Sequence, residues 1–233
     1  MPIMLRHRDA DAHEIMDDPN CDAQTLHNTY RQFRYVNAIS RSKWIYQRWV
    51  RPAMKANPAQ THSLLDIGFG GGDIVFQMAR WAEQDGLRLN ATGIELDSRA
   101  LDYVRTLQWP RNVMFRVANV HDLAASGEQF DFVISNHMLH HLNQRQFGEM
   151  LASAATVSKR FVLFIDLRRS DLAYLLFAAG TRPLFPNSYI HHDGLASLRR
   201  SYTFNELKQI TPPGWEVRRL FPFRLVLSRR AAP

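Results

Sequence analysis

The chain has 233 residues, of which 45% are hydrophobic, with 29 Lys plus Arg against 22 Asp plus Glu. This length and composition support a packed core and argue against a long disordered chain. The one cysteine, Cys21, excludes a disulfide framework and a thiolate metal cluster. We find neither a signal-peptide pattern nor an apolar run of membrane-spanning length, and therefore expect a soluble cytoplasmic protein.

The positive charge lies in the last third of the sequence. The formal net charge is +7 and the pI is about 9.9. Residues 159–233 hold 13 basic and 5 acidic side chains, whereas residues 1–158 hold 16 and 17. A basic excess raises the question of a nucleic-acid partner. Much of it comes in scattered arginine pairs, which suit an anionic small-molecule pocket or a solvated surface at least as well.

The first 60 residues are expected to be helical. Asp22 is a candidate cap for a helix from Ala23, because apolar and aromatic residues recur near helical spacing up to Ile39. The same pattern continues through residues 44–50, and Arg51–Pro52 is predicted to end it. Residues 1–60 are therefore assigned to an N-terminal helical lid, with packing against the next domain as the alternative role of its aromatic residues.

From Ser63 onward, short apolar segments alternate with amphipathic ones. This alternation predicts an α/β fold with a doubly wound, mostly parallel sheet. The expected strands cover residues 64–67, 89–95, 113–117, 130–135 and 161–165, and the expected helices residues 73–84, 98–107 and 144–157. We assign residues 61–233 to this domain.

The segment after the fifth strand breaks the alternation. Residues 167–202 are predicted to form an inserted cap or a substrate-binding loop. Thr203 and Glu206 then have capping-box spacing, which places a helix start at Phe204. Two closing strands over residues 215–220 and 223–228 are expected to add an antiparallel hairpin to the sheet.

A glycine-rich turn joins the first strand to the first helix of this domain, in Asp66-Ile67-Gly68-Phe69-Gly70-Gly71-Gly72-Asp73. Glycine lets the backbone approach a ligand closely, and the helix start offers free N–H groups. A dinucleotide fingerprint needs a third glycine where this chain has Asp73. A carboxylate there would repel a pyrophosphate, so we expect a cationic ligand and disfavour a nicotinamide oxidoreductase. Glu95, at the end of the second strand, is suited to accept hydrogen bonds from a ribose diol.

Three motifs follow one another in a familiar order: Asp66–Gly72, then Gly93-Ile94-Glu95-Leu96-Asp97, then Phe130-Asp131-Phe132-Val133-Ile134-Ser135-Asn136. From about Leu64 to Asp166 the chain resembles the class I S-adenosylmethionine-dependent methyltransferase family. The resemblance implies a seven-stranded Rossmann-like sheet whose last strand is antiparallel. It also implies S-adenosyl-L-methionine as the cofactor.

The resemblance assigns roles around the sulfur of that cofactor. It places Gly68, Phe69 and Gly70 along the methionine part and Asp66 near its amine. Asn136, after the fourth strand, matches a position beside the sulfonium and the amino-acid portion.

A second set of assignments concerns the nucleoside. By the same resemblance, Glu95 would hold the ribose hydroxyls and Leu96 would pack on the adenine. Asn119 and Val120 match the place where the family usually has an acidic residue on the adenine amino group. Asn119 departs from that acid, although its amide oxygen is still able to accept a hydrogen bond.

The sequence Ser-Asn-His-Met-Leu-His-His-Leu over residues 135–142 is similar to the small-molecule branch of the family, which includes quinone-biosynthesis and natural-product enzymes. Branches that methylate nucleic-acid amines usually have Asn/Asp-Pro-Pro-aromatic there, and this chain does not. We therefore expect a small-molecule substrate.

A phenolic acceptor with a pKa near 10 benefits from a base, and histidine suits that task. His140, His141 and Asp166 follow strand ends at the edge where such folds bind ligands, so they are the predicted catalytic residues. At most one of the two histidines is expected to face the pocket. Asp166 could orient a histidine, accept a proton or pair with a neighbouring arginine.

Residues 191–193, His-His-Asp, suggest a metal site, but adjacent ligands point in different directions, and we predict no metal. His191 is instead a candidate substrate contact, together with Arg168, Tyr189 and Arg199, because guanidinium groups pair well with anionic oxygens.

The sequence thus predicts O-methylation of a small aromatic acceptor, a phenol, quinol or polyketide-like compound, with S-adenosyl-L-methionine. The alternatives are an RNA methyltransferase, N- or C-methylation of a small molecule, and a non-catalytic binder of the same cofactor. The sequence leaves the oligomeric state open.

Overall fold

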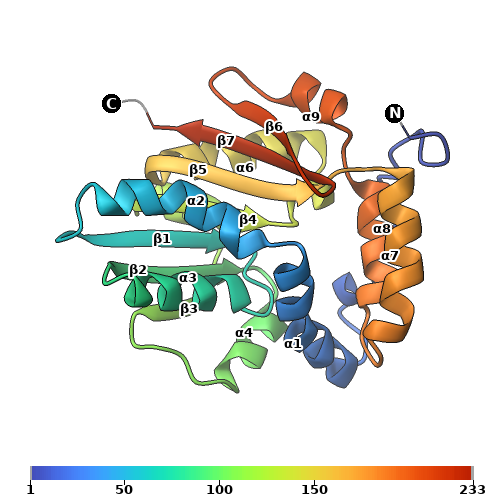
Figure 1. Cartoon of the computed structure of the whole chain (residues 1–233), viewed down its shortest axis with the longest axis horizontal. Coiled ribbons are helices and arrows are strands. Elements are labelled where there is room, and N and C mark those ends of the chain that lie inside the picture. Colours follow the sequence, from blue (N-terminus) through green and yellow to red (C-terminus); the bar gives the residue numbers. More distant parts are fainter. Residues whose placement is uncertain (1, 232–233) are drawn as a thin grey trace.

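The structure, a computed structural model, describes residues 2–231 and contains one seven-stranded sheet (Figure 1). The strand order is β3-β2-β1-β4-β5-β7-β6. The first five strands run parallel, and β7 is antiparallel to both of its neighbours. The strands are β1 (Thr61–Ile67), β2 (Arg88–Glu95), β3 (Val113–Val117), β4 (Phe130–Asn136), β5 (Ser158–Leu167), β6 (Glu216–Leu220) and β7 (Arg224–Arg230). The expected mostly parallel sheet with a closing antiparallel hairpin is confirmed.

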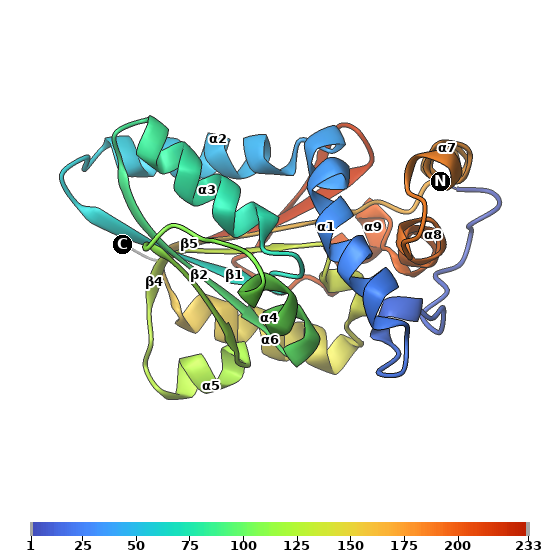
Figure 2. The same ribbon diagram turned by 90° about the horizontal axis from the view of Figure 1, so that it is seen from below.

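Helices cover both faces of this sheet (Figure 2). One core lies beneath α1, α2, α3 and α4, and a second lies beneath α5, α6 and α9. The helices are α1 (Ala23–Ile39), α2 (Ser42–Lys55), α3 (Asp73–Gln84), α4 (Ser98–Arg105), α5 (Val120–Ala125), α6 (Gln144–Thr156), α7 (Asp171–Leu184), α8 (Ile190–Arg200) and α9 (Phe204–Ile210), with short 3₁₀ turns η1 (Ile15–Asp17) and η2 (Leu139–His141).

The central strands are buried on both sides, which explains their continuous apolar sequence. In β5, Phe161, Leu163 and Ile165 face the first core, and Val162 and Phe164 face the second. Side chains alternate in the same way along β1 and β4. This alternation fixes which face each polar residue at the strand ends must point to.

The expected helical lid over residues 1–60 is only partly present. Residues 2–22 form an irregular segment with the single turn η1, because Asp9, Asp11, Asp17 and Asp18 interrupt any apolar stripe. We call residues 2–22 the N-terminal segment. Asp22 does cap α1, where its side chain accepts from the Thr25 N–H at 2.7 Å.

The prediction that a helix ends at Arg51–Pro52 is wrong. The chain instead turns at Arg41, which has a left-handed φ of 57°, and α2 then continues through Pro52 to Lys55. Pro52 is tolerated because it lies in the last turns of α2, where it costs one backbone hydrogen bond but leaves the buried face of the helix intact. Tyr46 on that face is fully buried.

The inserted segment after β5 is a helical hairpin. Helices α7 and α8 pack against each other beyond the carboxyl ends of the parallel strands, with the N-terminal segment beside them (Figure 1). Two carboxylates fasten that segment. Asp171 accepts from the N–H groups of Met4 and Leu5, and Asp193 accepts from those of Ile15 and Met16. The capping box expected at Thr203 and Glu206 is present at the start of α9.

Within residues 2–231, no helix combines the length and the apolar character needed to cross a bilayer.

Helix α1 lies directly on the glycine-rich turn. A Cβ at Gly71 would lie 2.5 Å from the carbonyl oxygen of Tyr30, whereas the ring of Phe33 lies over Gly70 at ordinary contact distance. A backbone oxygen cannot move aside as a side chain can, so only glycine at position 71 allows this approach. The turn and α1 therefore form one wall of the space above the sheet edge.

We predict that Gly71→Ala displaces α1 from the turn. The substitution should lower the free energy of unfolding by about 1–3 kcal/mol, the usual range for overpacking. It should also accelerate amide hydrogen exchange in α1.

Gly148→Ala in α6 is the matched control, because a Cβ there meets no atom within 4 Å. In a helix interior this change should stabilise the protein by about 0.5–1 kcal/mol. Equal stability and equal exchange in the two variants would contradict the tight contact between α1 and the turn.

Candidate functional site

Polar side chains gather at the carboxyl edge of the sheet, on the face covered by α1 and α2. Leu64 of β1 and Ile134 of β4 belong to the core on this face. Because side chains alternate along a strand, Asp66 and Asn136, two residues further on, point to the same side. Both follow buried apolar residues, so an acid and an amide lie close together below α1.

Three carboxylates form an uncompensated negative cluster there. Burial, together with the charges of Asp73 and Glu95, raises the pKa of Asp66 well above its usual value. Burial also raises the pKa of Asp73 to about 6, against hydrogen bonds that oppose the shift, and it raises the pKa of Glu95. Buried acids that repel one another in this way favour a bound cation.

Asn37 of α1 connects Asp73 to Asn136 through hydrogen bonds. Its Nδ2 lies 3.1 Å from each carboxylate oxygen of Asp73, and its Oδ1 accepts from Asn136 Nδ2 at 2.9 Å. Asp66 Oδ1 and Asn136 Oδ1 are buried and have no hydrogen-bond partner. Buried polar atoms are rarely left unpaired, so these two oxygens mark the place of a donor-bearing ligand.

The glycine-rich turn shapes the same place. Gly68 and Gly70 have φ values of 79° and 52°, which side-chain-bearing residues rarely adopt. Glu95 contacts the turn from β2, where its Oε2 lies 3.4 Å from Gly70 N and its Oε1 accepts from Leu96 N at 2.8 Å. The carboxylate cluster, the unpaired oxygens and the glycine-rich turn fit a cationic nucleoside such as S-adenosyl-L-methionine.

The residues expected around the nucleoside occupy different environments. Leu96 is 68% exposed, so it has a free face for a planar ring. Asn119 caps α5, and its Oδ1 accepts from His121 N at 3.0 Å, so the oxygen expected to meet the adenine amine already has one donor. Val120 is buried as the first residue of α5. The Phe69 ring packs on Phe115, which leaves only its backbone for the methionine part.

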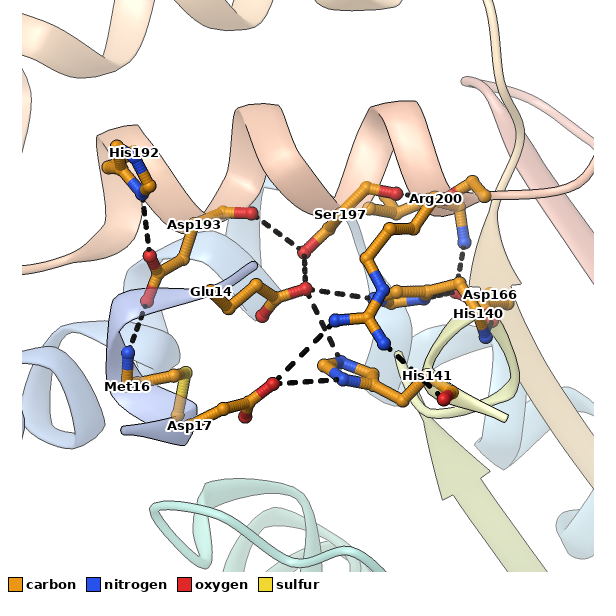
Figure 3. Close-up of polar contacts among 12 residues, drawn as sticks. Glu14, Met16, Asp17, His140, His141, Asp166, His192, Asp193, Ser197 and Arg200 are labelled. Atoms are coloured by element: carbon orange, nitrogen blue, oxygen red, sulfur yellow. Dashed lines mark hydrogen bonds and ion pairs between the residues drawn. The ribbon is translucent and has the colours of Figure 1, made fainter. Parts of the chain in front are cut away.

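The structure brings the three predicted catalytic residues together in an enclosed cluster (Figure 3). His140 Nδ1 lies 2.7 Å from Asp166 Oδ1, and His140 N donates to Asp166 Oδ2 at 2.8 Å. The other ring nitrogen of His140 points to Glu14 of the N-terminal segment, at 3.5 Å. His141 Nε2 lies 3.4 Å from the same Glu14 oxygen. Their assignment as bases stays a prediction, and their neighbours are carboxylates.

This environment shifts the pKa values of His140 and Asp166. Burial opposes the protonation of His140, but Asp166 and Glu14 outweigh it and raise the pKa of His140 to about 9. Burial favours the neutral form of Asp166, and the charge of His140 overcomes this and lowers the pKa of Asp166.

Sequence reasoning missed a second polar group at the sheet edge, His137 and Arg224. His137 follows Asn136 with a φ of 58°, and its Nε2 is buried without a hydrogen-bond partner. Burial and the charge of Arg224 lower the pKa of His137 well below 6.5, so the ring is neutral at pH 7.

Arg224, the first residue of β7, has a buried guanidinium whose Nε and Nη1 have no partner. Burial lowers its pKa to about 10, and the charges of Asp166 and Tyr46 oppose that shift. It alternates with Leu225 and so points to the same face as Val226, which belongs to the core beneath α1–α4. A strand that begins with arginine in an otherwise apolar run was the available signal for this residue.

The four predicted substrate residues have separate partners. The Arg168 guanidinium lies over the Phe223 ring, and the His191 ring hydrogen-bonds Thr181 inside the α7–α8 hairpin. Tyr189 N donates to Thr29 Oγ1 of α1. Arg199 faces Asp9 of the N-terminal segment. Among the described residues no contact joins these four, and their substrate roles stay predictions.

Comparison with known proteins supports the family resemblance. A family model described as a methyltransferase domain matches residues 64–160. A curated relative, the ubiquinone biosynthesis O-methyltransferase of Albidiferax ferrireducens, is 29% identical over 162 residues. The match covers 66% of this chain and 57% of that relative, so the chain spans a little over half of the relative's length.

Solved structures share the fold. The plantazolicin methyltransferase BpumL, in complex with a monoazolic desmethylPZN analog and SAH, has a TM-score of 0.65 at 13% identity, over 96% of this chain and 95% of that one. Magnesium protoporphyrin IX methyltransferase (ChlM) from Synechocystis PCC 6803 with bound SAH has a TM-score of 0.52 at 15% identity, over 82% and 83%.

The three motifs lie at the ends of β1, β2 and β4, where the sheet meets the polar cluster. On this basis, residues 64–160 match a methyltransferase domain, and the chain is similar to class I S-adenosylmethionine-dependent methyltransferases.

Proposed function

We propose that the protein transfers a methyl group from S-adenosyl-L-methionine to an oxygen of a small aromatic acceptor. The observation that carries the proposal is the buried negative cluster of Asp66, Asp73 and Glu95, in which Asp66 Oδ1 has no partner. The curated relative named for ubiquinone biosynthesis supports a phenolic or quinol acceptor.

When bound, S-adenosyl-L-methionine supplies an electrophilic methyl group on a sulfonium that leaves readily. Asp66 would accept a hydrogen bond from its amine, and Glu95 would accept from its ribose hydroxyls. Asn136 Oδ1, which has no partner, lies on the same face as Asp66 and would meet the amino-acid portion. Asn37 holds Asn136, and the three side chains together would fix the direction from which an acceptor must approach.

The acceptor side is formed by His137 and Arg224. A neutral, buried His137 with a free Nε2 is suited to take the proton of a phenol. The unpaired guanidinium nitrogens of Arg224 would stabilise the phenolate oxygen that results. An oxygen acceptor fits this pair better than an amine, because an arginine gives no advantage to a nucleophile that becomes cationic.

This assignment shifts the base from the histidines favoured by the sequence. His140 has carboxylates at both ring nitrogens, which suits a positioning role rather than contact with the acceptor. Asp166 would then orient His140, one of the roles expected for it.

The direct test incubates the purified protein with S-adenosyl-L-methionine and a panel of phenols, catechols and hydroquinones, with the matching anilines as nitrogen acceptors. We expect methyl ethers of one or more oxygen acceptors, together with S-adenosylhomocysteine, measured by mass spectrometry. Turnover of the anilines alone would replace the oxygen assignment by N-methylation.

Asp66→Asn should weaken the binding of S-adenosyl-L-methionine by about 10- to 100-fold, the value of a hydrogen bond to a charged group. Isothermal titration calorimetry measures the dissociation constant directly. Asp102→Asn is the control, because Asp102 is exposed on α4. Unchanged affinity in the Asp66 variant would mean that this carboxylate does not meet the cationic ligand.

Cofactor binding should also weaken at acid pH. The site holds its negative charge only while its carboxyl groups are ionised, and the pKa of Asp73 is about 6. For one coupled proton, affinity should fall about tenfold per pH unit below that value. Calorimetry between pH 5 and pH 8, at constant ionic strength, checks this; a flat profile over the range would contradict it.

His137→Gln should lower kcat by about 10²- to 10⁴-fold, the usual contribution of a general base. The dissociation constant of S-adenosyl-L-methionine, measured on the same preparation, should stay near the wild-type value and serves as the folding control. His121→Gln is a matched substitution at a histidine that contacts Ser153 instead. Full activity of the His137 variant would remove the histidine from the mechanism.

A further inference from the structure

We propose that Glu14, His140 and His141 bind a divalent transition-metal ion, with Zn²⁺ as the best match, and that this ion fastens the N-terminal segment to the sheet edge. The three side chains each present one ligand atom, and these atoms lie within 4.8 Å of one another. The inference rests on their geometry alone and is independent of the proposed methyl transfer.

The distances between the three ligand atoms fit a metal site. Glu14 Oε1 lies 3.5 Å from His140 Nε2 and 3.4 Å from His141 Nε2. N–H···O hydrogen bonds usually span about 2.7–3.2 Å. Ligands about 2.0–2.1 Å from a tetrahedral zinc are separated by about 3.3–3.4 Å, which is close to both observed separations.

The orientation of His140 also suits a cation between these atoms. His140 Nδ1 contacts Asp166 at 2.7 Å, so the Nδ1 proton is directed to that carboxylate. This leaves the Nε2 lone pair aimed at a Glu14 oxygen, an unfavourable contact unless a proton or a metal ion lies between them. Nε2 has no hydrogen-bond partner, and the His140 side chain is 1% exposed.

The surrounding residues complete a pattern that is common around histidine ligands of metals. Each histidine presents Nε2 to the shared centre and Nδ1 to an outer carboxylate, Asp166 for His140 and Asp17 for His141 (Figure 3). Such outer carboxylates orient the ring and raise its basicity toward the metal. Ser197 Oγ of α8 donates to Glu14 Oε1 at 2.8 Å and fixes the third ligand.

The charges agree with a divalent ion. The carboxylates of Glu14, Asp17 and Asp166 surround the two rings, and Arg200 supplies a positive charge 3.7 Å from Asp17. With both histidines neutral, as metal ligands must be, the cluster keeps an excess of negative charge. Two nitrogens and one carboxylate oxygen favour zinc over magnesium or calcium, which prefer oxygen ligands.

The site joins three parts of the chain that are distant in sequence. Glu14 immediately precedes η1, the histidines form η2 after β4, and Ser197 belongs to α8. An ion there would hold the N-terminal segment and the α7–α8 hairpin against the turn that carries His137. We assign it a structural role.

The test begins with protein purified without chelators, whose metal content is measured by inductively coupled plasma mass spectrometry. After removal of metal with dipicolinic acid, Zn²⁺ is titrated back, and Co²⁺ serves as a spectroscopic substitute. We expect one Zn²⁺ per chain, visible absorption bands typical of four-coordinate Co²⁺, and faster amide exchange in residues 12–17 when metal is removed.

Glu14→Gln and His141→Gln should each weaken Zn²⁺ binding by at least about tenfold. His141 is the safer substitution for folding, because a quarter of its side chain is exposed. His192→Gln is the matched control, since the exposed His192 contacts only Asp193 in the same region and should bind the ion as the wild type does. Circular dichroism checks that each variant is folded.

The proposal is overturned if the wild-type protein takes up neither Zn²⁺ nor Co²⁺. It is equally overturned if Zn²⁺ binds the two ligand variants as tightly as the His192 control, because the ion would then lie elsewhere. Neither result depends on S-adenosyl-L-methionine or on any acceptor, so failure of the proposed function leaves this test unaffected.

Discussion

Buried negative charge at the carboxyl ends of β1 and β2 is the constraint on which the site depends. Asp73 and Glu95 are close enough to raise the pKa of Asp66, burial raises the pKa of all three carboxyl groups, and no cation within residues 2–231 hydrogen-bonds to Asp66. Such an arrangement is unfavourable by itself, because burial penalises charge. A positively charged ligand bound in this site would offset that free-energy cost.

The fold supports this arrangement from two directions. Because side chains alternate along the strands, Asp66 and Asn136 point to one face, and α1 covers that face with Asn37 hydrogen-bonded to Asp73 and Asn136. The close approach of α1 depends on Gly71, so the glycine-rich turn serves packing as well as ligand access. On the far side, the α7–α8 hairpin and the N-terminal segment close around the cluster of His140 and Asp166.

Much of this could be predicted from local sequence patterns. Helix α3 and strand β3 have the predicted bounds, and the capping box at Thr203 is present, because periodicity and capping are local properties of the chain. The motif residues Asp66, Glu95 and Asn136 lie at strand ends for the same reason. Pro52 shows the limit of local rules: the packing of Tyr46 and the rest of the buried face of α2 outweighs the backbone hydrogen bond that proline removes.

The remaining features depend on contacts between distant segments. Nothing near Glu14 in the sequence indicates that it meets His140 and His141, whereas residues 191–193 suggest a metal site by their local pattern. Arg224 and Asn37 were missed likewise, since each acquires its role only when β7 and α1 reach the sheet edge. Arg168 and Arg199, two of the predicted substrate contacts, have separate partners: Arg168 lies over Phe223 and Arg199 faces Asp9.

The most direct test of the central claim is the number of protons exchanged when S-adenosyl-L-methionine binds at pH 6. This number follows from binding enthalpies measured in buffers of different ionisation enthalpy. If a cation relieves the repulsion among Asp66, Asp73 and Glu95, their pKa values fall on binding and protons are released to the buffer. Binding without proton release, or with proton uptake, would contradict the account.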